Sequence, residues 1–110
     1  MPEKPNTLCC IVPCYNEEDS LPAFFETMDG VAEGLREGLG LEVAYVFVDD
    51  GSSDRTLEIV RARRERDPRC HYVSFTRNFG KEAGMLAGMR AALELFPGED
   101  DLFALMDADL

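Results

Sequence analysis

Two aspartates near the end of the chain, Asp107 and Asp109, have the residue type and spacing of a cation site. They follow the apolar run 101–106 and are separated by one residue, so at the end of a strand their side chains point to the same side. Paired carboxylates repel each other unless a cation lies between them. Mg²⁺ and Mn²⁺ prefer such oxygen ligands, and Mg²⁺ is typically held by one or two carboxylates and by substrate phosphates. The pair predicts a metal site for a diphosphate, whereas the simpler alternative is two solvated turn residues.

A second acidic cluster, DDGSSD, follows another apolar run at residues 49–54. Asp49 and Asp50 are adjacent and cannot share one face of a strand. One of them can therefore accept hydrogen bonds from a base or ribose while the other caps the following turn. The simpler alternative is a capped strand-to-helix loop in which Gly51 supplies an unusual backbone angle. A calcium loop is excluded, because the pattern D-x-D-x-D-G is absent.

Two further polar clusters, PCYNEED and TRNFGKE, follow the first and third apolar runs. Tyr15 offers an aromatic face for stacking on a base and Glu17 offers an acceptor, although a surface tyrosine and an acid at a helix start would look the same. Arg77 and Lys81 either meet phosphate or neutralise neighbouring acid. A Walker A loop is excluded, because Glu82 stands where Ser or Thr is required, and G-x-G-x-x-G is absent after the first strand.

The elements that must position these clusters alternate between strands and helices. Apolar runs predict buried strands at 8–12, 41–48, 70–75 and 101–106. Helices are predicted between them, starting at Ser20, at Ser53 or Asp54, and near Gly80, and ending near residues 40, 66 and 95. This order predicts an α/β fold, a Rossmann-like parallel sheet with helices on both faces. All four polar clusters then lie along the edge where ligands bind, outside the carboxyl ends of the strands.

The third predicted helix carries small residues at helical spacing. Gly80, Gly84 and Gly88 lie four apart, with alanines beside them. A face of small residues lets a helix approach a sheet closely, and this interpretation is favoured over a phosphate-binding loop because the pattern has the spacing of a helix.

Composition excludes several function classes for these 110 residues, whose length fits one domain. The formal net charge of −11 argues against binding to nucleic acid and against adsorption to an anionic membrane surface. The four cysteines lack the spacing of a metal or redox site and are expected to be small buried hydrophobes in a reducing, cytosolic compartment. No apolar run approaches the roughly 20 residues of a membrane span.

The motifs PCYNEE, VDDGSSDRT, TRNFGKEAGMLAG and MDADL, in this order and spacing, resemble those of family 2 glycosyltransferases of the GT-A fold. Within that family the resemblance is closest to polyprenyl-phosphate and dolichyl-phosphate sugar transferases, and it covers residues 8–110. It implies inverting transfer of a sugar from a UDP- or GDP-linked donor to a lipid phosphate, with Mg²⁺ or Mn²⁺ as cofactor.

The resemblance also implies roles for individual residues. Asp107 and Asp109 would hold the metal and act in catalysis, and Val48 and Asp50 would contact the base and ribose with Asp49 in support. The candidate nucleotide-sugar site, which includes the two basic residues, comprises Pro13, Tyr15, Glu17, Val48, Asp49, Asp50, Arg77, Lys81, Met106, Asp107, Ala108 and Asp109. Met106 and Ala108 would contribute backbone contacts.

Relatives of this kind continue past the D-x-D motif with a half that shapes the acceptor side, and many add interfacial or transmembrane helices. Because the sequence stops directly after an apolar run, we expect residues 1–110 to be the N-terminal part of a longer protein at the cytoplasmic face of the membrane. We expect this part alone to bind nucleotide weakly and to turn over poorly or not at all.

Three alternatives are a family 2 transferase with a saccharide acceptor, a non-catalytic nucleotide-binding or receiver-type module, and another Mg²⁺-dependent phosphoryl or nucleotidyl transferase. The D-x-D pair disfavours a receiver, and the missing glycine-rich phosphate loop disfavours the last.

Overall fold

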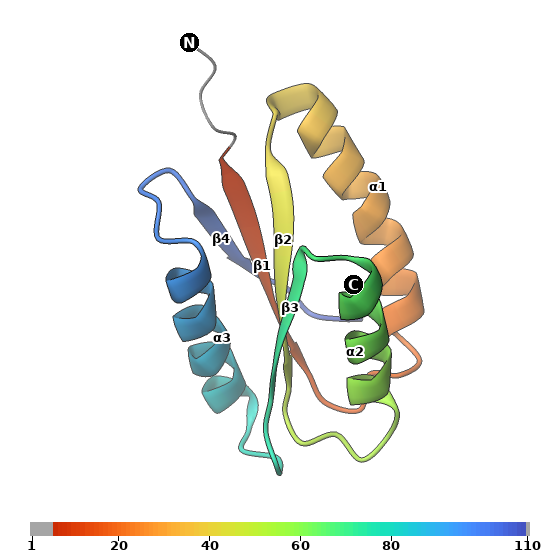
Figure 1. The fold of residues 1–110 in the computed structure, drawn as a ribbon. Coiled ribbons are helices and arrows are strands. Elements are labelled where there is room, and N and C mark those ends of the chain that lie inside the picture. Colours follow the sequence, from red (N-terminus) through yellow and green to blue (C-terminus); the bar gives the residue numbers. More distant parts are fainter. Residues whose placement is uncertain (1–5, 110) are drawn as a thin grey trace.

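The computed structural model describes residues 6–109 and shows a parallel sheet with helices on both faces (Figure 1). The elements are β1 (Thr7–Cys14), α1 (Leu21–Leu39), β2 (Glu42–Asp49), α2 (Thr56–Arg66), β3 (Cys70–Ser74), α3 (Lys81–Leu95) and β4 (Leu102–Leu105). The predicted alternation is confirmed, and each strand ends within two residues of its predicted limits. Residues 1–5 and Leu110, the ends of the domain expected at 1–110, lie outside the described residues.

The four strands are ordered β3-β2-β1-β4, and all of their pairings are parallel. From β1 the chain passes through α1 to β2 on one side, whereas β4 pairs with the other side of β1 (Figure 1). Ile11, in the middle of β1, is in register with Val46 of β2 and Leu105 of β4. The direction of strand addition therefore reverses between β1 and β4, and open α/β sheets bind ligands at such a switch point.

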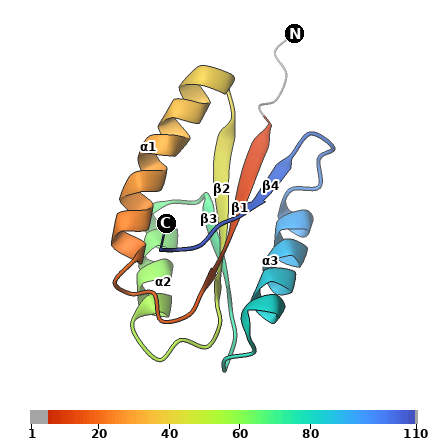
Figure 2. The ribbon, with the colours of Figure 1, turned by 180° about the vertical axis from the view of Figure 1, so that it is seen from behind.

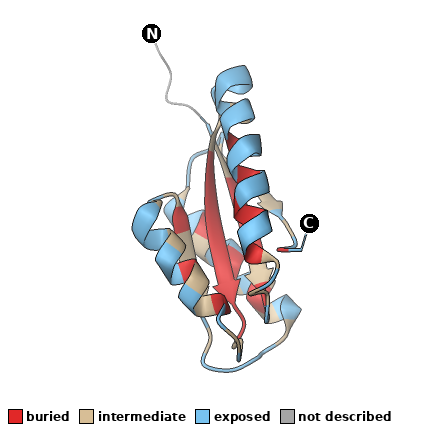
Figure 3. Cartoon of the chain, turned by 90° about the vertical axis from the view of Figure 1, so that its right-hand side faces the viewer, coloured by how far each residue is buried: buried red, intermediate tan, exposed pale blue. Residues whose placement is uncertain are grey.

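Helices α1 and α2 cover one face of the sheet and α3 covers the other (Figure 2). Alternate residues of β1 point to the two faces, so Val12 packs towards α1 and α2 while Ile11 packs towards α3. The central strands β1 and β2 are mostly buried, and the outer faces of the helices are exposed (Figure 3). Burial on both faces accounts for the nearly continuous apolar runs of β1 and β2. All four cysteines are free and buried, as predicted.

The small residues of α3 allow the predicted close approach to the sheet. Gly84 and Gly88 are buried, and a Cβ atom on Gly88 would lie 2.5 Å from Cγ2 of Ile11 and 3.0 Å from Cγ2 of Val48. Gly80 does not belong to this packed face, contrary to the prediction. It lies just before the helix, with φ of 101° and nothing within 4 Å of the place that a Cβ atom would take, so its role is to turn the chain into α3.

Two helix starts differ in detail from the sequence prediction. Ser20 occupies the N-cap position of α1, but its side chain makes no capping hydrogen bond. Helix α2 begins at Thr56, later than predicted, and the side chain of Asp54 accepts the backbone N–H of Thr56 at 2.9 Å. Of the two residues proposed to cap α2, Asp54 therefore satisfies a free N–H of the first turn and Ser53 does not.

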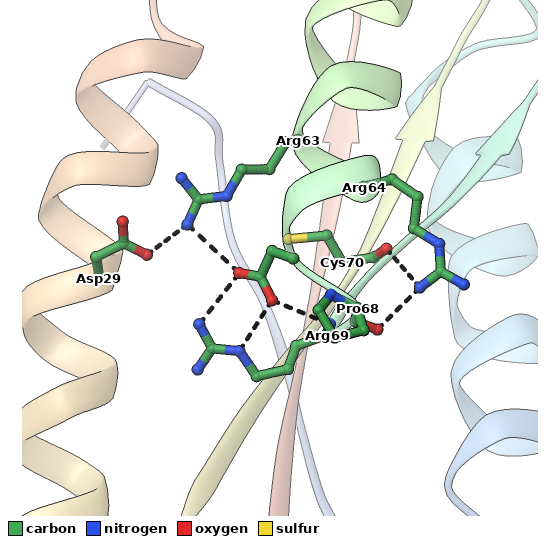
Figure 4. A network of polar contacts seen from close by, with 7 residues as sticks. Asp29, Arg63, Arg64, Pro68, Arg69 and Cys70 are labelled. Atoms are coloured by element: carbon green, nitrogen blue, oxygen red, sulfur yellow. Dashed lines mark hydrogen bonds and ion pairs between the residues drawn. The ribbon is translucent and has the colours of Figure 1, made fainter.

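A network of charged side chains joins the end of α2 to α1 and to the start of β3 (Figure 4). Arg63 pairs with Asp29 of α1 and with Asp67, and Arg69 donates two side-chain hydrogen bonds to Asp67, each 3.1 Å long. Arg64 donates to the carbonyl oxygens of Pro68 and Cys70. Asp29, Arg63, Asp67 and Arg69 help to line a cavity of about 650 Å³, but their charges are already paired with one another, which indicates a structural role.

Large apolar side chains are exposed on α3 and on β4, the strand at the free edge of the sheet beside β1. They are Leu86, Met89, Leu93, Leu95, Leu102, Phe103 and Leu105. A strand that is apolar at every position is typical of the interior of a parallel sheet. Within residues 6–109, no helix combines the length and the apolar character needed to cross a membrane.

Candidate functional site

A cavity of about 470 Å³ lies at the carboxyl ends of the strands, between the segments that follow β1 and β4. All four polar clusters contribute to its wall. The lining residues are Pro13, Cys14, Tyr15, Glu17, Asp50, Asn78, Gly80, Lys81, Asp107 and Asp109. The connections that follow β1, β2 and β3 meet at one edge of the molecule (Figure 1). The cavity therefore occupies the switch point between β1 and β4, where the topology favours a ligand.

Hydrogen bonds between side chains and backbone groups join the loop after β1 to the segment after β2. The N–H of Asn16 donates to Oγ of Ser52 at 2.9 Å, and the N–H of Ser53 donates to Oδ1 of Asn16 at 2.8 Å. The N–H of Glu17 donates to Oγ1 of Thr56 at 2.8 Å. These bonds fix the loop that carries Tyr15 and Glu17. Sequence reasoning missed Asn16, whose φ of 53° is a conformation that Asn tolerates better than most residues.

The adjacent aspartates divide their roles, as the sequence predicts in outline. Asp49 accepts the N–H of Ser52 at 3.2 Å and so caps the turn. Asp50 lines the cavity and is only 4% exposed. Its carboxylate accepts the N–H of Phe79 at 2.7 Å and the N–H of Gly80 at 3.1 Å. The carboxylate of Asp50 is therefore largely occupied by hydrogen bonds from the loop before α3.

The D-x-D pair faces the acidic side of the first cluster. Strand β4 ends at Leu105, so Asp107 and Asp109 lie in the segment after the strand and not at its last positions, yet both line the cavity. Burial raises the pKa of Glu17, and the charges of Asp109 and Asp107 raise it further. These three acidic residues line the same cavity, where a cation would reduce their mutual repulsion.

Lys81 brings positive charge to this acidic group. Its Nζ atom lies 3.1 Å from Oδ1 of Asp107, across 26 positions of the sequence. This contact is the neutralisation of acid considered for Lys81, and its binding to phosphate stays a prediction.

Comparisons with known proteins agree with this geometry. The sequence profile described as Glycosyl transferase family 2 matches residues 9–110. The chain belongs to glycosyl transferase family 2. A prophage bactoprenol glucosyl transferase homolog of Escherichia coli (strain K12) is 42% identical to it over 79 residues, which are 72% of this chain and 24% of the relative. An undecaprenyl-phosphate 4-deoxy-4-formamido-L-arabinose transferase of Pseudomonas paraeruginosa (strain DSM 24068 / PA7) is 38% identical over 102 residues, covering 91% of this chain and 27% of the relative.

A solved structure of another protein has a similar fold. The mannosyltransferase PcManGT from Pyrobaculum calidifontis, in complex with GDP-Man and Mn²⁺, matches with a TM-score of 0.72 and 23% sequence identity, covering 96% of this chain and 28% of that chain. The likeness confirms the predicted GT-A fold, and the two curated relatives confirm the predicted resemblance to polyprenyl-phosphate sugar transferases. The chain spans about a quarter of the length of the curated relatives it matches.

The remaining candidate residues of this family 2 chain lie around the cavity or behind it. Tyr15 is half-exposed at the rim, where its ring is accessible. Val48 and Ala108 are buried in the core and are not among the residues that line the cavity. The N–H of Met106 is already bonded to the carbonyl oxygen of Ile11 at 3.0 Å.

Arg77 is not among the residues that line the cavity. Its guanidinium lies over the ring of Phe79, 4.5 Å from the centroid, on the exposed loop before α3. The structure therefore brings Lys81 into the cavity and leaves Arg77 outside it.

Proposed function

We propose that this chain is the donor-binding part of a glycosyltransferase that moves a sugar from a nucleoside-diphosphate sugar to a polyprenyl phosphate. The observation that carries the proposal is the cavity at the β1–β4 switch point, whose lining includes the D-x-D residues and the exposed Tyr15. The names of the two curated relatives support the acceptor class, and the GDP-Man of the structural relative supports the donor class.

The donor would lie across the cavity with its base at the rim. Tyr15, which is half-exposed, offers a stacking face for the base, and the loop that carries it is braced by the hydrogen bonds of Asn16 and Glu17. The diphosphate would lie over Asp107 and Asp109. Asp50 would act on the ribose side chiefly by holding Gly80 and its neighbours in place.

The carboxylates fit a divalent cation such as Mg²⁺ or Mn²⁺. Among the described residues, no group of three or more His, Cys, Asp or Glu side chains is arranged around one ion position. A pair of carboxylates is nevertheless enough for Mg²⁺ or Mn²⁺, since such ions complete their coordination with water and substrate phosphates. Asp107 and Asp109 would hold the ion, and Glu17 adds to the negative field. When bound, the ion would stabilise the negative charge that develops on the leaving diphosphate.

The transfer itself needs little from protein side chains. A phosphate oxygen of the acceptor forms a bond to the anomeric carbon of the sugar, and the bond between that carbon and the diphosphate oxygen breaks. The nucleoside diphosphate leaves with the electron pair, and displacement from the opposite face inverts the anomeric configuration. Because the acceptor phosphate is already an anion, no general base is required. A water-soluble donor and a lipid-linked acceptor meet at a membrane surface, so we place the reaction at its cytoplasmic face.

We also propose that residues 1–110 form the donor half of a larger domain. The exposed apolar side chains of α3 and β4 support this, since they offer a sheet edge and a helix face on which further elements can pack. The two curated relatives are about four times as long as this chain, which is long enough to include such elements.

Titration calorimetry tests the donor site. UDP, GDP, UDP-glucose and GDP-mannose are titrated into the chain with and without Mn²⁺, and into the variant Asp107→Asn/Asp109→Asn. The matched control, Glu94→Gln/Asp100→Asn, removes the same charge from exposed positions outside the cavity. We expect metal-dependent binding of one nucleotide that the D-x-D variant loses and the control keeps. Equal binding by the D-x-D variant would contradict the proposal. If the chain binds none of the four, the same titration of a longer chain decides.

A further inference from the structure

The segment Asn78–Lys81, which leads into α3, is fixed to the rest of the protein by two sets of contacts. Its main anchor is the buried carboxylate of Asp50, which accepts the N–H of Phe79 at 2.7 Å, the N–H of Gly80 and Nδ2 of Asn78, the last two at 3.1 Å. Nδ2 of Asn78 also lies 3.2 Å from the carbonyl oxygen of Asp50. Hydrogen bonds to a buried charged group are among the stronger ones in proteins.

A second anchor is the contact between two backbones. A Cβ atom on Gly51 would lie 2.1 Å from the carbonyl carbon of Arg77 and 2.3 Å from the backbone nitrogen of Asn78. The loop after β2 therefore touches the loop before α3 with no room for a side chain, and φ of 68° at Gly51 suits glycine. Together the two anchors fix the first residue of α3, Lys81, relative to the sheet.

The long side chain of Lys81 is exposed to solvent, although its backbone is fixed. The side chains of Lys81 and Asp107 are 65% and 67% exposed, and ion pairs this exposed contribute little to stability because water competes for both charges. Among the described residues that line the cavity, Lys81 is the one cation beside Glu17, Asp50, Asp107 and Asp109. The pair is therefore weak enough to exchange partners. The ammonium group of Lys81 can do so while the backbone of this residue stays in place.

Building on the proposed function, we propose that Lys81 is an exchangeable counter-ion of the donor site. In the free protein its ammonium group neutralises Asp107. When a metal-bound diphosphate occupies the D-x-D pair, the ammonium group leaves Asp107 and binds a phosphoryl oxygen. The receiving oxygen belongs either to the donor diphosphate or to the acceptor phosphate, which present the same chemistry to a lysine.

This exchange predicts opposite effects on two ligands. Lys81 competes with a bare metal ion for Asp107 and adds a repulsive positive charge, so it weakens the binding of the ion alone. It then contributes an ion pair to the phosphate, so it strengthens the binding of the metal–phosphate complex. The lysine thereby couples the ion to its phosphate, and the coupling favours ions that arrive with a substrate.

The test compares Lys81→Gln with the wild type in two titrations, Mn²⁺ alone and UDP or GDP in the presence of Mn²⁺. Arg90→Gln is the matched control, since it removes the same charge from an exposed position on α3 roughly 13 Å further along the helix. We expect Lys81→Gln to bind Mn²⁺ up to about five-fold more tightly and to bind the nucleotide complex several-fold more weakly. Lys81→Arg keeps the positive charge, so both of its affinities should lie between those of Lys81→Gln and the wild type. Arg90→Gln should change neither affinity.

A third titration, with farnesyl phosphate in the presence of Mn²⁺ and the nucleotide, identifies the receiving oxygen. If Lys81→Gln weakens this step and not the nucleotide step, the phosphate of the acceptor receives the lysine. Changes of the same sign in both the ion and the phosphate titrations, or no change in either, would overturn the exchange. If Asp107→Asn loses the ion while Lys81→Gln behaves as wild type, the donor site stands and the role of Lys81 fails. If Asp107→Asn binds like the wild type, both proposals fail together.

Discussion

The carboxylate of Asp50 accepts the backbone N–H of Phe79 at 2.7 Å, and this bond ties the end of β2 to the loop that begins α3. The two residues lie 29 positions apart, and Asp50 is nearly inaccessible to solvent. An acidic residue at a strand end is often exposed to ligand or water. Here it serves as the internal support of the cavity wall, so the stability of the fold and the shape of the site depend on the same side chain.

Replacement of Asp50 by Asn tests this support. Asparagine keeps one acceptor oxygen but turns an NH₂ group towards backbone donors, so at least one of the N–H groups of Phe79 and Gly80 loses its partner. We expect a loss of about 1–3 kcal/mol in the free energy of unfolding. Amide hydrogen exchange of Phe79 and Gly80 should accelerate, because these donors hold the loop. Denaturant unfolding and exchange measured by NMR check both effects. Asp100→Asn, at an exposed position, should stay within about 0.5 kcal/mol of the wild type.

The contribution of Asp50 shows where sequence reasoning reached its limit. The apolar runs and the helical periodicity predicted all seven elements, because strands buried on both faces leave a local pattern. The convergence of four polar clusters also followed, since parallel strands share one carboxyl edge. The partners of Asp50 could not be predicted, because they lie in a loop whose path depends on the packing of α3. The pairing of Lys81 with Asp107 depends in the same way on the path of a segment after β4.

Two glycines test the backbone contact between the loops. Gly51→Ala would place a methyl group within 2.1 Å of the backbone of Arg77 at a left-handed φ, so both loops must separate. We expect a loss of several kcal/mol or failure to fold. Gly34→Ala is the matched change inside α1, where nothing lies within 4 Å of the added Cβ. It should stabilise the protein by about 0.5–1 kcal/mol through helix propensity. Thermal unfolding of the two variants distinguishes these cases, and equal shifts in Tm would contradict the contact.

The close approach of α3 to the sheet predicts unequal effects at two positions of that helix. In Gly88→Ala the methyl group would lie 2.5 Å from Ile11, at a buried position, so the helix must move outwards. We expect a loss of about 1–3 kcal/mol from overpacking. In Gly84→Ala the nearest atoms, on Pro13 and Val48, are at an ordinary 3.8 Å, so the change should be neutral or stabilising. Urea unfolding measures both. A larger loss for Gly84→Ala than for Gly88→Ala would show that the helix lies elsewhere on the sheet.

The ionic network at the other end of the sheet predicts how stability depends on pH. Burial of Asp67 opposes its ionisation, but hydrogen bonds from Arg69 and the charge of Arg63 outweigh this and lower the pKa of its carboxyl to about 2, from an ordinary value of 3.8. A lowered pKa in the folded state stabilises the fold above the ordinary value. That stability, here about 2 kcal/mol, is lost as the pH falls from about 4 through 2.

The variant Asp67→Asn isolates this effect, because it removes the charge and nearly preserves the shape. At pH 7 it should be less stable than the wild type by about 2 kcal/mol or more, since Arg63 and Arg69 lose their shared partner. Below pH 4 the wild-type carboxyl takes up its proton, so the two proteins should converge as the pH approaches 2. Urea unfolding at intervals from pH 7 to pH 2 measures the difference, with Asp100→Asn as the control for an exposed carboxyl. A difference that stays constant across that range would show that the stability does not come from the charge of Asp67.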